Sequence, residues 1–145
     1  MGKTISGEDV VKVPEGYDPA KDKTYMSPTM LAFFREKLIG WKQELVNENR
    51  SLVETMQTEA ISYPDPADTA AANADRQFEL RTRDRTRKLI HKIDQALMRV
   101  DDGEYGYCEH TGDEIGVARL IARPVATLSI EAQEMHEKGE RLRAS

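Results

Sequence analysis

The residues whose types and spacing come nearest to a chemical site lie in the stretch GYCEHTGDEIG, Gly106–Gly116, which contains the only cysteine of the chain. Structural zinc is commonly held by two C-x2-C knuckles that present four thiolate or imidazole ligands. The corresponding frame here reads Cys108-x2-Thr111-x17-Ser129-x2-Ala132. Hydroxyl groups stay protonated at neutral pH, and alanine has no donor atom. The frame is that of a zinc finger, but one thiolate cannot supply the metal site.

Other metal-ligating side chains do not complete the frame. His110 is only two residues from Cys108, and His91 and His136 lie where helices are expected. We therefore expect no zinc and no other resident cofactor. Aliphatic packing should hold the segment, helped by Ser129 as the N-cap of the next helix, which is worth about 1 kcal/mol. Cys108 is expected to be a small, half-buried hydrophobic residue and not a nucleophile.

A second candidate site is the acidic turn YPDPADTAA, in which Asp65 and Asp68 are three residues apart. Helix capping explains both carboxylates, with Asp65 as N-cap, Pro66 as the first helical residue and Asp68 near the positive end of the helix dipole. The turn would also form the tip of a long hairpin, where two carboxylates could meet a divalent cation or a basic loop of a partner. The spacing alone leaves both interpretations open.

Long helices must position these two sites. Ser27 and Pro28 form a helix start, and the apolar residues that follow have the three-four spacing of a heptad seam. They are Leu31, Phe34, Leu38, Trp41, Leu45 and Leu52. The seam weakens at Glu48 and Thr55. The pattern predicts a helix to about Ile61, roughly 45 to 50 Å long at 1.5 Å per residue.

A second long helix follows the acidic turn and is expected to end at Gly103 as C-cap. Its apolar positions are Ala71, Ala74, Phe78, Leu89, Ile93, Ala96 and Val100. Its basic stretch RTRDRTRK, residues 81–88, either pairs with first-helix acids such as Glu44, Glu48 and Glu54 or forms a contact surface for an acidic protein groove. Two long helices joined by a short turn make an antiparallel hairpin.

The predicted protein is all-α, with a long antiparallel coiled-coil hairpin that projects from a small globular domain. That domain contains a degenerate zinc-finger-like segment and a C-terminal helix. The expected regions are a partly ordered N-terminal arm packed on the globular head (1–26), the hairpin (27–104) with its acidic tip (64–70), the finger segment (105–128) and the C-terminal helix (129–145).

Composition restricts the class of function. The net charge of -5 and the pI near 5.3 argue against general nucleic-acid binding, which needs a basic surface. A single cysteine, no signal-peptide stretch and no apolar run of membrane length favour a cytoplasmic protein without membrane contact. No phosphate-binding glycine loop and no nucleophile with its base are present, so we expect no enzyme.

Together these residues resemble the DksA/TraR family of bacterial RNA polymerase-binding transcription regulators. The resemblance runs from about Met30 to Leu142 and rests on PDPAD at the turn, ELRTRDRTRKLIHKI on the second helix, GEYGYCE and GDEIGVARLIARP in the finger, and the x17 spacing. It implies a monomer that binds RNA polymerase, without sequence-specific DNA binding. The hairpin tip would enter the secondary channel and destabilise promoter complexes, together with ppGpp in the stringent response.

The resemblance also implies roles for individual residues. The tip residues would be Asp65, Asp68 and Ala70. The ppGpp pocket, formed jointly with the polymerase, would include Leu89, Lys92, Arg123 and Gln133, the last standing at a position that is basic in the family. Arg85 would contact the polymerase. Because three of the four zinc cysteines are absent, the chain is similar to the cysteine-poor, zinc-independent branch, expected to act under zinc limitation or oxidative stress.

Two alternatives belong to other functional classes. Transcript-cleavage factors of the Gre type also use an acidic hairpin tip, but they lack this finger frame. A coiled-coil adaptor or tether would have no role at the polymerase active centre. An adaptor should tolerate Asp68→Asn, whereas a channel-inserting regulator should still bind the polymerase yet lose its effect.

Overall fold

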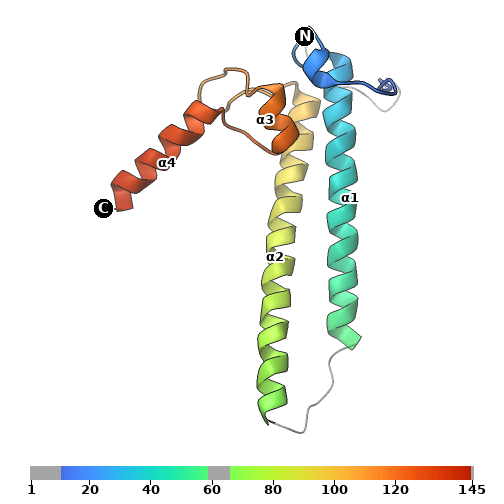
Figure 1. The fold of residues 1–145 in the computed structure, drawn as a ribbon, viewed down its shortest axis with the longest axis vertical. Helices are drawn as coiled ribbons and strands as arrows, with labels where there is room; N and C mark the ends of the chain where they lie inside the picture. The colour runs from blue at the N-terminus through green and yellow to red at the C-terminus, as the bar shows by residue number, and fades with distance from the viewer. Residues whose placement is uncertain (1–10, 59–65, 145) are drawn as a thin grey trace. The chain divides into compact units, whose positions relative to one another are not determined.

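The computed structural model describes residues 11–58 and 66–144, and this part of the chain is α-helical, as predicted. Its elements are the short 3-10 helix η1 (Pro19–Lys21) and the helices α1 (Pro28–Thr58), α2 (Pro66–Asp102), α3 (Val117–Ala122) and α4 (Ile130–Ala144) (Figure 1). No β-strand occurs within the described residues, where Tyr107 and Glu114 form an isolated antiparallel bridge.

The start of α1 follows the sequence signals. The Ser27 side-chain oxygen accepts a hydrogen bond from the backbone N–H of Met30 at 3.2 Å, which is the bond of an N-cap. Pro28 occupies the first helical position, where a missing N–H is tolerated. α1 is described as far as Thr58, and its predicted end near Ile61 lies outside the described residues.

The chain divides into two compact units. The hairpin unit is Ile39–Asp94, and the finger unit is Met1–Leu38 together with Gln95–Ser145. In the hairpin unit α1 and α2 run antiparallel (Figure 1). Lys42 Nζ lies 2.6 Å from the Asp94 carboxylate, and Asn49 Nδ2 donates to the Arg83 carbonyl oxygen at 3.4 Å. Residues further along α1 therefore meet residues earlier in α2.

Burial in the hairpin unit is concentrated on the heptad seam. Ile93 is fully buried and Leu45 nearly so, whereas Trp41 and Leu52 are half-buried. The sequence predicts that the seam weakens toward the acidic turn, and the apolar positions of α2 there are open to solvent: Ala71 and Ala74 are exposed and Phe78 is 65% exposed. The reason is that α1 becomes polar in the same direction, through Glu48 and Thr55, and offers little apolar surface to cover them.

No ion pair joins the basic stretch 81–88 to Glu44 or Glu48 within the described residues. The ion pair that the hairpin unit does contain joins Lys42 of α1 to Asp94 of α2. Arg81, Arg85 and the other basic side chains of the stretch are therefore available for other contacts.

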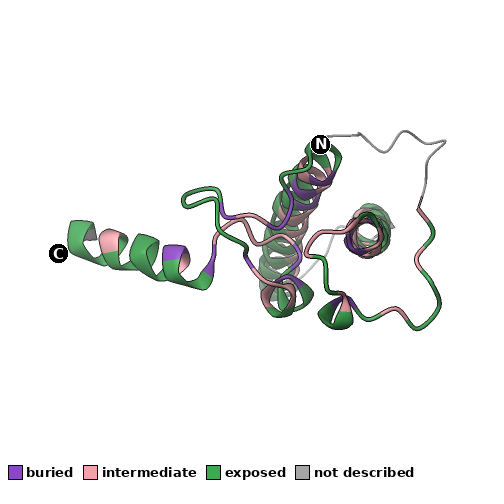
Figure 2. Cartoon of the chain, turned by 90° about the horizontal axis from the view of Figure 1, so that it is seen from above, coloured by how far each residue is buried: buried purple, intermediate pink, exposed green. Residues whose placement is uncertain are grey.

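A single apolar core organises the finger unit. Its most deeply buried side chains come from α1 and from the finger, and they are Met30, Phe34, Leu38, Tyr105 and Leu120. The end of α2 adds Ala96 and Val100, each 4% exposed. The rings of Phe34 and Tyr105 lie 5.5 Å apart, and the Tyr105 hydroxyl donates to the Pro124 carbonyl oxygen at 2.8 Å. Of α4, only the first turn has a buried residue, Ala132, and the rest of the helix is largely exposed (Figure 2).

The segment before α1 is ordered by Asp22. Its carboxylate accepts hydrogen bonds from the Tyr17 and Ser27 hydroxyls, both at 2.7 Å, and from the backbone N–H of Thr24 at 3.0 Å. These bonds, the one from Tyr17 foremost, lower the pKa of the Asp22 carboxyl below its ordinary value. The Tyr17 ring also packs on Phe33 of α1, with centroids 5.8 Å apart.

The finger segment contains a helix that the sequence did not predict. α3 covers six residues and follows Gly116, which makes no side-chain capping bond. Lys37 Nζ of α1 donates to the Ile121 carbonyl oxygen of α3 at 3.1 Å, and Leu120 is fully buried. Tertiary contacts therefore hold this short helix, which has no strong local start signal.

Candidate functional site

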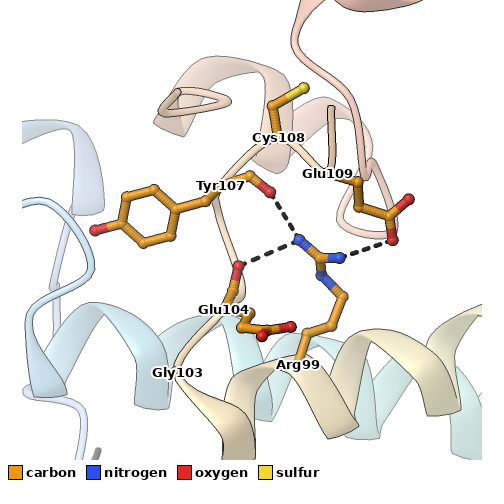
Figure 3. A pocket seen from close by; sticks show the side chains of 6 residues that line it. All are labelled: Arg99, Gly103, Glu104, Tyr107, Cys108 and Glu109. Carbon is orange, nitrogen blue, oxygen red and sulfur yellow. Dashed lines mark hydrogen bonds and ion pairs between the residues drawn. The ribbon is translucent and has the colours of Figure 1, made fainter. Parts of the chain in front are cut away.

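The finger starts at the carboxyl end of α2, where the Arg99 side chain binds the residues that follow the helix. Gly103 takes a positive φ of 77° and ends the helix, as predicted. The Arg99 guanidinium donates to the carbonyl oxygens of Glu104 (3.2 Å) and Tyr107 (2.7 Å) and forms an ion pair with Glu109 at 2.7 Å (Figure 3). Arg99 lies in the last turn of α2, where a cation also compensates the helix dipole, and both carbonyl oxygens that it binds lie beyond the end of the helix.

These residues line a pocket of about 510 Å³ together with Cys108. Arg99 already has three acceptors, so it offers no unused donor pair for an anion, and its side chain is only 17% exposed. The Cys108 sulfur points away from the guanidinium (Figure 3). The pocket is therefore best explained as a structural feature. Arg99 binds three residues of the chain that follows α2 and so fixes the path of that chain through Cys108.

Backbone hydrogen bonds close the first knuckle. Cys108 N–H donates to the Asp113 carbonyl oxygen at 2.8 Å, and Gly112 N–H returns to the Cys108 carbonyl oxygen at 2.9 Å. Ile115 N–H donates to the Gly106 carbonyl oxygen at 2.8 Å. Cys108 is 3% exposed, so it is more deeply buried than the half-buried position expected of it.

The second knuckle position is a helix start. Ser129 Oγ accepts a hydrogen bond from Ala132 N–H at 3.2 Å, which confirms Ser129 as the N-cap of α4. Both residues are 6% exposed. Glu109 N–H donates to the Thr127 carbonyl oxygen at 2.9 Å, and this bond joins the first knuckle to the chain that leads to the second.

The thiol of Cys108 lies in a cradle of hydrogen-bond donors. Burial raises its pKa, but hydrogen bonds from the Thr111 side chain and from backbone N–H groups of Ser129, Thr111 and His110 outweigh burial and lower the pKa to about 6. The thiolate of Cys108 is therefore favoured over its thiol at neutral pH.

The donor set at the frame does not fit zinc. Thr111 is exposed and its hydroxyl accepts from Asp113 N–H at 3.2 Å, Ser129 Oγ is used as a cap, and Ala132 has no donor. Across residues 11–58 and 66–144, no group of three or more His, Cys, Asp or Glu side chains is placed to hold a metal ion. One sulfur is far from the four ligands of a structural zinc site.

Tyr25, in the segment before α1, supplies a contact that sequence reasoning missed. Its hydroxyl donates to the Gly106 carbonyl oxygen at 2.6 Å and accepts from Gly116 N–H at 3.0 Å. Its ring meets that of Tyr107 edge-on, with centroids 5.7 Å apart. The neighbouring Met26 side chain fills the space beside Gly106, where a Cβ would lie 2.7 Å from Met26 Cε. This segment therefore covers both ends of the first knuckle.

At the acidic turn, Asp68 is exposed in the first turn of α2, and Ala70 is exposed beside it. Asp65, the other predicted tip acid and expected N-cap, lies outside the described residues. The structure therefore leaves the Asp68 carboxylate accessible near the positive end of the helix dipole.

The remaining predicted site residues are distributed over both units. Leu89 is half-buried on α2 and Lys92 is exposed, both in the hairpin unit, as is the exposed Arg85. In the finger unit, Arg123 is exposed directly after α3, and Gln133 on α4 donates to the Glu137 carboxylate at 3.1 Å.

No helix in the described part of the chain is both long enough and apolar enough to span a membrane.

Two family models match the chain between residues 30 and 138. Residues 30–100 match the family described as "DnaK suppressor protein DksA, N-terminal domain", and residues 103–138 match the "Prokaryotic dksA/traR C4-type zinc finger". The second match is to a four-cysteine finger, whereas this chain has one cysteine. Residues 103–138 therefore match the sequence pattern of that finger with a different donor set.

Individual relatives agree with the family matches. The RNA polymerase-binding transcription factor DksA of Caulobacter vibrioides is 55% identical over 87% of this chain and 89% of its own length. That of Escherichia coli K12 is 44% identical over 88% and 84%. The solved structure of transcription factor DksA2 from Pseudomonas aeruginosa superposes with a TM-score of 0.77 at 43% identity, covering 83% of this chain and 92% of that one.

Proposed function

This chain belongs to the DksA family, and on that premise we propose that it is a cytoplasmic, monomeric transcription regulator that binds RNA polymerase directly. It inserts the turn between α1 and α2 into the secondary channel and destabilises promoter complexes, acting with ppGpp in the stringent response. It catalyses no reaction of its own and makes no sequence-specific contact with DNA.

The observation that carries the proposal is the accessible carboxylate of Asp68 in the first turn of α2. The two long helices run antiparallel in the hairpin unit, so the first turn of α2, which carries Asp68, is at one end of that unit. An exposed carboxylate there can act on a basic group or a divalent cation without first breaking an ion pair, since Asp68 makes none within the described residues.

The effector belongs to the same proposal. The exposed cations Lys92 and Arg123 would each contact phosphate oxygens of ppGpp bound at the polymerase, and Leu89 would offer it an apolar surface. Gln133 replaces a cation and is already bonded to Glu137. We therefore expect a weaker response to ppGpp than in relatives with a basic residue at that position.

The proposal also includes independence from zinc. The frame offers one thiolate, so the protein should regulate the polymerase under zinc limitation and under oxidants that release zinc from four-cysteine fingers.

The test is transcription in vitro from a stable-RNA promoter with purified polymerase, comparing wild type with Asp68→Asn. Asp75→Asn is the matched control, because Asp75 is exposed on the same helix and the substitution removes the same charge. We expect wild type and Asp75→Asn to inhibit, and Asp68→Asn to bind the polymerase with similar affinity while losing most of the inhibition. Lys92→Ala and Arg123→Ala should lose the added effect of ppGpp.

Other results would favour the other functional classes. If Asp68→Asn inhibits as well as wild type, the tip mechanism is wrong. If wild type is folded but neither binds polymerase nor changes transcription, the adaptor becomes the better interpretation. Stimulated cleavage of RNA in backtracked complexes, lost in Asp68→Asn, would indicate a factor of the Gre type.

A further inference from the structure

The carboxyl end of α3 lies beside a lysine of α1 that has no acidic partner. Lys37 Nζ donates to the Ile121 carbonyl oxygen at 3.1 Å, and this bond lies at the surface. Lys37 is half-buried and makes no ion pair within the described residues. A lysine ammonium has three N–H donors. The bond to Ile121 therefore fixes the ammonium at the end of α3 and leaves it donors for a ligand.

A second cation follows at the same end of α3. Arg123 is the residue directly after the helix, is exposed, and also makes no ion pair within the described residues. Only one residue separates it from Ile121, the residue that Lys37 binds, and two residues of chain span at most about 7 Å. The carboxyl end of α3 therefore brings two cations from distant parts of the sequence together.

The surrounding chain does not neutralise these cations. Residues 117–128 contain no Asp or Glu. η1 packs against α3, but Asp18 accepts a backbone N–H of η1 at 3.0 Å, and Asp22 accepts the two hydroxyls described above. Glu36 is exposed about 100° around α1 from the lysine. Two cations without acidic partners form a site that suits an anion.

We propose that Lys37 and Arg123 form a two-cation phosphate site at the carboxyl end of α3, and that Lys37 is a further residue that binds ppGpp. This inference rests on the proposed function, which expects ppGpp at Arg123 and gives Lys37 no role. Adjacent cations match a diphosphate, which carries negative charge on each phosphate, and lysine is a common phosphate ligand. Lys37 would also supply part of the charge that Gln133 lacks.

A purely structural role for Lys37 predicts something different. A cation at the carboxyl end of a helix compensates its dipole, and Lys37 could act only by holding α3 in place. Its loss would then loosen the finger and weaken every activity together. A residue that binds ppGpp should affect only the response to ppGpp. Lys37→Met keeps an unbranched stem and removes the charge, whereas Lys37→Arg keeps the charge.

The experiment titrates ppGpp into transcription in vitro from a stable-RNA promoter, with purified polymerase and a saturating concentration of the full-length protein. We expect Lys37→Met to raise the ppGpp concentration for half-maximal added inhibition about tenfold, which is the effect of losing one hydrogen bond to a charged group. Its inhibition without ppGpp, its affinity for the polymerase and its thermal midpoint should stay close to those of wild type. Lys37→Arg should restore most of the response.

Lys138→Met is the matched control. Lys138 is exposed in the same unit, and the substitution removes the same charge from the same residue type. We expect this variant to respond to ppGpp like wild type. An equal loss in Lys138→Met and Lys37→Met would mean that net charge matters and not this site, and would overturn the inference.

The other outcomes separate the inference from the proposed function. A response of Lys37→Met that matches wild type would overturn the inference and leave the proposed function standing. The same holds for equal losses with and without ppGpp, or for no recovery in Lys37→Arg, since Lys37 would then act through structure and not through charge. If wild type does not inhibit, or if ppGpp adds nothing to its inhibition, the proposed function fails in that part and the inference fails with it.

Discussion

The Tyr25 hydroxyl donates a hydrogen bond to the Gly106 carbonyl oxygen across 81 residues of sequence, at 2.6 Å, and accepts another from Gly116 N–H at 3.0 Å. One side chain from the segment before α1 thus joins the two ends of the loop that carries Cys108. In a finger whose residues do not fit zinc, this contact performs part of the closure that a metal would provide.

Tyr25→Phe should therefore loosen the finger. Removal of the hydroxyl leaves the part-buried Gly116 N–H without a partner and takes one of two hydrogen bonds from the Gly106 carbonyl oxygen, which keeps its bond from Ile115 N–H. We therefore expect the free energy of unfolding to fall by about 1 to 2 kcal/mol. Denaturant unfolding measures that loss, and hydrogen exchange at Gly116 should become faster. Tyr107→Phe is the control, because no hydrogen bond of the Tyr107 hydroxyl is present among the described residues. Equal losses in both variants would contradict the role given to Tyr25.

Gly106→Ala should destabilise the finger for two reasons. Gly106 has a φ of 92°, which strains any residue with a Cβ, and that Cβ would lie 2.7 Å from Met26 Cε. Gly112→Ala isolates the first reason, since Gly112 has a φ of 74° and open space around it. We expect a loss of about 1 to 2 kcal/mol from backbone strain in both, and a further loss in Gly106→Ala from displacement of Met26. Thermal unfolding of the two variants side by side would detect the difference, and a larger loss in Gly112→Ala would refute it.

The helices could be predicted because their signals are local. Ser27 with Pro28, Gly103 and Ser129 each mark a helix end through residues that are neighbours in sequence, and the heptad spacing identified Ile93 and Leu45 as buried. Phe78 has the same spacing but is exposed, since burial depends on what the facing helix offers, and α1 is polar there.

The contacts that close the finger could not be predicted in this way. Tyr25 meets Gly106 and Gly116 across 81 and 91 residues, and no spacing rule connects a tyrosine to two distant glycines. α3 was missed because it lacks a side-chain cap and is held by packing. Arg99 could have been found only in part: its place in the last turn of α2 suits the helix dipole, but its acceptors Glu104 and Tyr107 lie beyond the helix, where no local rule predicts them.

Cys108 should titrate as an unusually acidic thiol. Its pKa is lowered from an ordinary value near 9 to about 6, so at pH 7 to 8 the folded protein holds a thiolate where the unfolded chain holds a thiol. Between pH 6 and 9 the unfolded state then binds more protons than the folded state. The contribution of Cys108 to the free energy of unfolding should therefore rise with pH over this range and be absent below pH 6. Thiolate absorbance at 240 nm and urea unfolding against pH measure both effects.

Cys108→Ser provides the baseline for that titration, since serine does not ionise in this range. The difference in unfolding free energy between wild type and Cys108→Ser should therefore grow with pH. Alkylation by iodoacetamide should nevertheless be slow in the folded protein, because the side chain is 3% exposed. A midpoint near 8.5 or above would show that the donor cradle does not stabilise the anion.

Removal of metal should leave both the fold and the regulation of polymerase unchanged. Thr111 is bonded to Asp113 N–H, Ser129 caps α4 and Ala132 has no donor, so chelation takes nothing from the frame. In peptide fingers zinc contributes roughly 10 to 16 kcal/mol to folding, so a metal-dependent finger would unfold outright on chelation. EDTA-treated protein should keep its thermal midpoint and its inhibition in vitro, whereas a family member with four finger cysteines, treated in parallel, should lose both. Stoichiometric zinc in the purified protein, with unfolding on its removal, would mean that the finger is completed by ligands beyond this frame.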